Sequence, residues 1–240
     1  MTPDYAERAP SGARGISVLR ASEPLMAWPG WAQVRWFLAL WVVLSAEFVV
    51  VFGGGDFITA HREMRLHLYL QSEFAIPFIP SMVVAYMSIY LVFLPAPFVL
   101  RARPEINGLA IALAKGILVA GVGFLVFPAQ LGFPSTPSEV AKLDPEATHR
   151  WGALLLFADR LNLDYDLIPS LHVALFVACA SVYAVRAGVV VRSLLATWAA
   201  AVAASTVLTH QHQVIDVIAG LALGLWAAVD AHKRQGRGAT

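Results

Sequence analysis

With 240 residues, 58% of them hydrophobic and only 14% charged, the chain is far more apolar than a soluble globular domain, which excludes that class. The net charge of +1 is too small to favour nucleic acid as a partner. The composition therefore predicts an integral membrane protein that is embedded in a lipid bilayer.

Six apolar segments are long enough to cross a bilayer, whose hydrocarbon core of about 30 Å needs roughly 20 residues of helix. In chain order they fall near residues 36–52, 82–100, 109–127, 167–185, 189–208 and 214–229. We therefore expect an all-α, six-helix membrane bundle over residues 31–230. Residues 1–30 and 231–240 are expected to be tails.

Six crossings place both termini on one side of the membrane, and the basic residues indicate which side. Five basic residues fall on the opposite side: Arg62, Arg65, Lys142, Arg150 and Arg160. Ten fall on the side of the termini: Arg8, Arg14, Arg20, Arg101, Arg103, Arg186, Arg192, Lys233, Arg234 and Arg237. Because cytoplasmic loops carry the excess of Lys and Arg, both termini are predicted to be cytoplasmic.

Two longer loops are then expected on the outer side, at about residues 53–78 and 128–166. The first mixes apolar and charged residues, as in an amphipathic helix that lies at the membrane interface. The second begins with several prolines, is predicted to be helical near residues 151–160, and is long enough to cover a site.

Two polar islands interrupt the apolar sequence, and the topology places both at the outer side. One is PSLH at residues 169–172, and the other is STVLTHQHQVIDVIAG at residues 205–220. If the last helix starts near His212, then His212 and Asp216 share one helix face, and the carboxylate can orient one imidazole nitrogen and leave the other free. Gly220 and Gly224 form a GxxxG step that allows a close helix contact, which would hold His212 against the fourth span.

The chemistry open to these islands is phosphoryl transfer. A neutral imidazole held by a carboxylate can attack phosphorus, and a second histidine, His172, can protonate the departing oxygen. Ser170 and the backbone amide of Leu171 lie at an expected helix start, where free N–H groups favour an anionic phosphoryl group.

The PSLH segment followed by S-T-x5-H-x3-D resembles the second and third signatures of the type 2 phosphatidic acid phosphatase superfamily, which has a six-helix membrane fold. The resemblance implies that His212 is the nucleophile, Asp216 its orienting partner and His172 the general acid. It also implies phosphate contacts from Ser170 and Ser205, and we add Leu171, Thr206 and His210 as candidates. The details are most similar to a branch that includes inositol phosphorylceramide synthases and bacterial relatives, which implies a bacterial inner or plasma membrane.

Two departures from the family pattern both remove positive charge. Thr206 stands where the third signature usually has arginine, and the first signature is missing, with Ala96 where its lysine would stand relative to Arg103-Pro104. The phosphate charge therefore needs a cation from another part of the chain. The candidates on the outer side are Arg62, Arg65, Lys142, Arg150, Arg160 and a protonated His210.

The sequence thus predicts a lipid phosphatase that acts on a lipid or polyprenyl phosphate at the outer face through a phosphohistidine, without a cofactor. If an alcohol replaces water as the acceptor, the enzyme is a lipid phosphotransferase. A metal site built from His172, His210, His212 and Asp216 is an alternative, as in a transporter or metallohydrolase, and so is a catalytically silent scaffold. The lone cysteine, Cys179, provides neither a disulfide nor a thiolate metal site.

Overall fold

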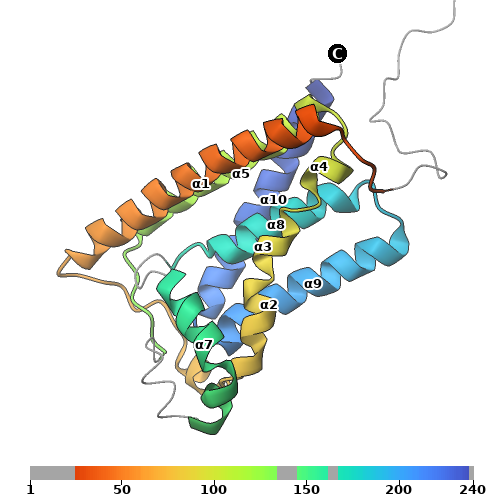
Figure 1. The fold of residues 1–240 in the computed structure, drawn as a ribbon. Coiled ribbons are helices and arrows are strands. Elements are labelled where there is room, and N and C mark those ends of the chain that lie inside the picture. The colour runs from red at the N-terminus through yellow and green to blue at the C-terminus, as the bar shows by residue number, and fades with distance from the viewer. Residues whose placement is uncertain (1–24, 134–144, 162–166, 238–240) are drawn as a thin grey trace, which may run out of the picture.

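The computed structural model describes residues 25–133, 145–161 and 167–237, and within these ranges the chain is helical with no β-strand (Figure 1). Lys142 and most of the N-terminal tail lie outside the described residues. Among the described residues, four helices are long and apolar enough to cross a membrane: α1 (Trp31–Ala60), α5 (Arg103–Val126), α9 (Val189–Leu208) and α10 (Val214–Arg237). The bounds of α9 match the predicted segment at both ends.

The first outer loop differs from the prediction. Helix α1 continues to Ala60, so the start of the predicted loop at residues 53–78 belongs to this helix. The next residues do not form an amphipathic helix; Leu66 donates to Pro128 O at 2.7 Å and accepts from Gln130 N at 3.0 Å. The two predicted loops are therefore joined by backbone hydrogen bonds, and a short 3-10 helix, η1 (Gln71–Ala75), follows.

The predicted second span, residues 82–100, is a series of short helices instead of one long helix. These are η2 (Pro80–Met82), α2 (Val83–Met87), α3 (Ile89–Val92) and α4 (Ala96–Val99). Pro95 and Pro97 lack the backbone N–H that a continuous helix needs. The Ser88 hydroxyl also donates to Ala85 O at 2.6 Å, between α2 and α3. Helix α7 (Pro145–Leu161) contains the helical stretch predicted in the second loop.

Helix α8 (Leu171–Ala184) is the centre of the bundle, although its 14 residues span only about 21 Å. It packs against α10, α9, α5, α3 and α4, so its polar N-terminus lies inside the protein and not at its edge (Figure 1). The described part of the chain thus contains four long apolar helices and two shorter apolar segments, where six spans were predicted.

The two GxxxG glycines allow α10 to approach α8 closely. A Cβ atom on Gly220 would lie 2.6 Å from Ser170 O, and one on Gly224 would lie 2.6 Å from Ala174 O. These distances are too short for any side chain, so only glycine permits this helix contact. The prediction that the step brings α10 against the fourth apolar segment is confirmed.

The start of α1 and the end of α10 lie at the same end of the bundle. Trp36 Nε1 in α1 donates to Asn107 Oδ1 in α5 at 2.7 Å, and Gln235 Nε2 in α10 donates to Glu105 O at 3.2 Å. Both contacts are in the first turns of α5. This arrangement agrees with an even number of crossings, while the cytoplasmic position of that end stays a prediction.

Replacing Gly220 by alanine should lower the free energy of unfolding by about 1–3 kcal/mol, because the new methyl group overpacks the contact with Ser170 O. Gly116→Ala is the matched control, since open space surrounds Gly116 in the middle of α5, and there alanine should stabilise by about 0.5–1 kcal/mol. Thermal unfolding of the purified variants measures both. Equal midpoints for Gly220→Ala and wild type would refute the close-contact argument.

Candidate active site

The turn between α9 and α10 positions His212. His210 adopts a left-handed backbone conformation (φ 54°), and two hydrogen bonds of 2.9 Å, from His210 N to Val207 O and from Gln211 N to Thr206 O, close the end of α9. This is the Schellman pattern of a helix C-terminus. His212 N donates to the same Thr206 carbonyl at 2.9 Å, which fixes the backbone of His212 two residues before α10 starts.

Asp216 is completely buried and lies beside the His212 imidazole. Its Oδ2 atom is 3.5 Å from His212 Nδ1, within ion-pair range but longer than a good hydrogen bond, and it accepts from Gln213 N at 2.9 Å. The predicted pairing is thus found, although His212 precedes the helix. The carboxylate on the Nδ1 side leaves Nε2 as the nitrogen available to a substrate.

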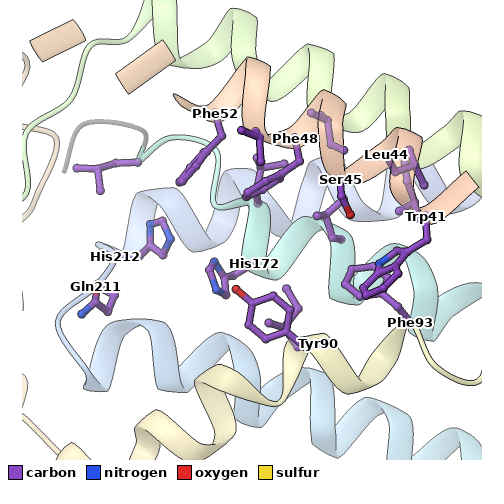
Figure 2. Close-up of a pocket in the computed structure, with 17 residues that line it drawn as sticks. Trp41, Leu44, Ser45, Phe48, Phe52, Tyr90, Phe93, His172, Gln211 and His212 are labelled. Carbon is purple, nitrogen blue, oxygen red and sulfur yellow. The ribbon is translucent and has the colours of Figure 1, made fainter. Parts of the chain in front are cut away.

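His172, the second residue of α8, faces His212. The centroids of the two imidazole rings are 6.2 Å apart, and the His172 ring stacks on Tyr86 at 4.3 Å. Figure 2 shows both histidines at the same end of a cavity. A group bound between the rings would have one imidazole on each side.

The N-terminus of α8 connects the two polar islands directly. Ser170 N donates to Asp216 O at 3.0 Å, and the buried Ser170 hydroxyl accepts from Val173 N at 3.5 Å as the N-cap of α8. Leu171 lines the cavity beside His172. Ser170 itself does not line the cavity, although it begins α8 at the positive end of the helix dipole, two residues before His172. The role of Ser170 and Leu171 as phosphate contacts stays a prediction.

Ser205 and Thr206 are buried at the end of α9, and their hydroxyl groups donate to Val202 O at 2.7 Å and to Ala203 O at 2.8 Å. Neither residue lines the cavity. Their role as phosphate contacts stays a prediction. In the structure the Thr206 carbonyl orders the turn that holds His212.

His210 packs away from the two catalytic candidates. Its ring stacks on Phe133 at 4.1 Å, and Nε2 lies 3.1 Å from Ile76 O. Burial lowers the pKa of His210 below its ordinary value of 6.5, and the Ile76 carbonyl only partly opposes this shift. The environment of His210 thus disfavours the protonated form in which it was predicted to compensate phosphate charge.

The arginine candidates also lie outside the cavity. Arg62 donates to Leu125 O at 2.5 Å and Arg65 to Ala60 O at 2.7 Å, whereas Arg150 and Arg160 are exposed on α7. Over the described ranges, no arginine or lysine lines the cavity. The same part of the chain has no group of three or more His, Cys, Asp or Glu side chains that could hold a metal ion.

Glu73 in η1 is a buried acid that the sequence did not indicate. Its Oε2 atom accepts from Val214 N and its Oε1 atom from Leu70 N, both at 2.9 Å, and the residue is only 4% exposed. Together with Asp216, it satisfies the first amides of α10 with carboxylate oxygens. The amides of Gln213 and Val214 are therefore occupied by carboxylates, whereas the start of α8 has no acid at its first amides.

The cavity itself is about 210 Å³ and mostly apolar. Its walls come from α1, α3, α5 and α8, with Phe48 and Phe52 above the histidines and Tyr90 below them in the view of Figure 2. The sequence could not indicate these residues, because apolar side chains that line a cavity look like those that face lipid.

Comparison with known proteins supplies one match. A family model described as the PAP2 superfamily matches residues 59–229, a range that contains both polar islands. No curated protein and no solved structure matches the chain.

Removing the Glu73 carboxylate should destabilise the site. Glu73→Ala leaves the part-buried amides of Val214 and Leu70 without their carboxylate acceptor, and a hydrogen bond to a charged group contributes about 1.5–3 kcal/mol. The midpoint of thermal unfolding should be clearly lower for this variant than for wild type. It should hardly change for Glu63→Ala, which removes an exposed acid in the same segment. Similar midpoints for the two variants would refute the anchoring role.

Stability should fall in acid partly through His210. Because its folded pKa is lowered, the unfolded chain binds the proton more readily, so stability is lost as pH falls below 6.5, by at most about 1.4 kcal/mol per pH unit. His210→Asn does not titrate and tolerates a left-handed backbone. Unfolding midpoints between pH 7.5 and 5.5 should decrease less steeply in this variant, and equal slopes would contradict the assignment.

Proposed function

Because the chain belongs to the PAP2 superfamily, the type 2 phosphatidic acid phosphatases, we propose that it is a membrane-embedded phosphatase of lipid or polyprenyl phosphates. The reaction is hydrolysis of a phosphomonoester or diphosphate through a phosphohistidine intermediate. The observation that carries this proposal is the arrangement of two facing imidazoles, one of them beside a buried carboxylate, at the end of an apolar cavity.

In the first step, His212 Nε2 attacks phosphorus while Asp216 holds the Nδ1–H and stabilises the charge that develops on the ring. The bond from phosphorus to the lipid oxygen breaks, and His172 donates the proton that the lipid alcohol takes away. Water then attacks the phosphohistidine and transfers a proton to His172, which releases inorganic phosphate and restores both histidines.

The phosphoryl oxygens are placed against the start of α8. The Ser170 hydroxyl and the Leu171 amide lie in its first turn, and this turn is bonded to Asp216 through Ser170 N. Support for this placement comes from Glu73 and Asp216, since their carboxylates accept from Val214 N and Gln213 N and would repel an anion at the start of α10.

The membrane setting is proposed on the same grounds as the substrate. The site has two chemical environments, a polar end with the two histidines and an apolar cavity. A lipid phosphate fits both, with its phosphate at the histidines and its hydrocarbon chain in the cavity. We place this site at the outer face of a bacterial plasma membrane, with both termini in the cytoplasm, from the distribution of basic residues.

A lipid phosphotransferase is the second candidate, and the charge of the cavity favours it. A phosphomonoester carries about −1.5 to −2 charges near pH 7, whereas a phosphodiester carries only one. Over the described residues the cavity lining has no arginine or lysine to compensate the larger charge. In this reaction His212 takes a phospho-headgroup from a phosphodiester lipid and an alcohol replaces water in the second step.

His212→Ala should reduce turnover to background, because the proposed covalent intermediate forms on its imidazole. His172→Ala should reduce it by roughly 10²–10⁴-fold, with a smaller loss for an aryl phosphate, whose leaving group needs no proton. The assay is the release of inorganic phosphate or alcohol from lipid monophosphates, diphosphates and phosphodiesters, with and without alcohol acceptors.

The control for this assay is His61→Ala, which changes an exposed histidine at the end of α1 and should retain full turnover. Wild-type turnover in His212→Ala would rule out the mechanism. Product formation only when both a phosphodiester and an alcohol are present would select the transferase.

A further inference from the structure

A second, smaller void continues the main cavity along α1. It is about 30 Å³, and its lining shares four residues with the main cavity: Trp41, Leu44, Phe93 and Leu113. These four side chains therefore form a partition, with the main cavity on one side and the small void on the other.

The partition lies at the end of the cavity that is far from the two histidines. Figure 2 shows Trp41 and Phe93 at the opposite end from His212 and Gln211. From Trp41 to Phe52, α1 rises by about 16 Å at 1.5 Å per residue, so the cavity is elongated along this helix.

The shape and lining fit one linear hydrocarbon chain. The volume of about 210 Å³ is below the roughly 300–1,000 Å³ of ordinary ligand sites, which leaves room for a single chain and not for two. Its rim on α1 is the exposed stripe of Trp41, Ser45 and Val49, which repeats every four residues, and Tyr90 of α3, 47% exposed, lines the cavity as well. A chain can enter across this rim from the surrounding lipid.

We propose that Trp41 and Phe93 determine the length of the hydrocarbon chain that the enzyme accepts. This inference rests on the proposed function, because the phosphate end of the chain is placed at His172 and His212. A chain in the bilayer is already out of water, so entry into the cavity gains little from the hydrophobic effect. Selection therefore depends on fit, and a chain that is too long must displace Trp41 or leave across the rim.

The test measures kcat/KM along two series of increasing chain length, n-alkyl monophosphates and prenyl monophosphates. For wild type we expect kcat/KM to fall by roughly five- to a hundredfold once the chain is longer than the distance to Trp41. This range corresponds to the energetic cost of overpacking a well-packed site. A decrease in both series indicates selection by length alone, and a decrease in one series identifies the kind of chain that fits.

Trp41→Ala and Phe93→Ala open the partition and should move the decrease to longer chains. Ile117→Phe should move it to shorter chains, because Ile117 lies one turn of α5 nearer the histidines than Leu113. Trp31→Ala is the matched control, since Trp31 is also on α1 but is 67% exposed and lines neither void. If kcat/KM falls at the same chain length in wild type and in all cavity variants, the proposal is overturned.

A binding measurement separates this proposal from the proposed function. The thermal unfolding midpoint of the protein in nanodiscs is recorded with each n-alkyl phosphate, without any need for turnover. If no series is hydrolysed but stabilisation still depends on length and shifts in Trp41→Ala, the chain site stands and the phosphatase does not. If hydrolysis occurs and neither profile shifts, the phosphatase stands and the chain-length role is wrong.

Discussion

The close contact between α8 and α10 is the constraint on which the site depends. His172 belongs to one helix and His212 to the turn before the other, so the distance between their rings is set by how closely these helices approach. Gly220 permits an approach that any Cβ atom would prevent, and the backbone hydrogen bond from Ser170 N to Asp216 O joins the two polar segments there. Backbone contacts between the two helices thus set the distance between the histidines, and the Asp216 and Glu73 carboxylates hold the turn before α10.

The electrostatics of the site are unusual for a phosphate enzyme. Two buried carboxylates, Asp216 and Glu73, lie at the start of α10, while the cavity has no basic side chain over the described residues. This balance puts a carboxylate beside His212 but, among the lining residues, no cationic side chain for a doubly charged phosphate. For the proposed reaction, substrates that bring less negative charge to the histidines fit this site better, and the helix dipole and amides of α8 supply its positive potential.

Local sequence patterns predicted what local physics determines. The hydrophobic run of α9, the GxxxG step and the spacing of His212 and Asp216 each depend on residues close together in the chain, and each was found in the structure. The prediction of one continuous span at residues 82–100 was wrong. It relied on the apolar composition of this segment and gave too little weight to the prolines that interrupt the helix. Glu73 could not be predicted, because its partner Val214 is 141 residues away and no pattern marks an acid that caps a distant helix.

If His212 carries the phosphoryl group during turnover, the phosphohistidine can be trapped. Wild-type protein is mixed with a labelled lipid phosphate, denatured within milliseconds at alkaline pH where phosphohistidine survives, and digested for mass spectrometry. We expect a phosphate or phospho-headgroup on His212 that decays as product forms. A label on another residue, or turnover without any label on His212, would contradict it.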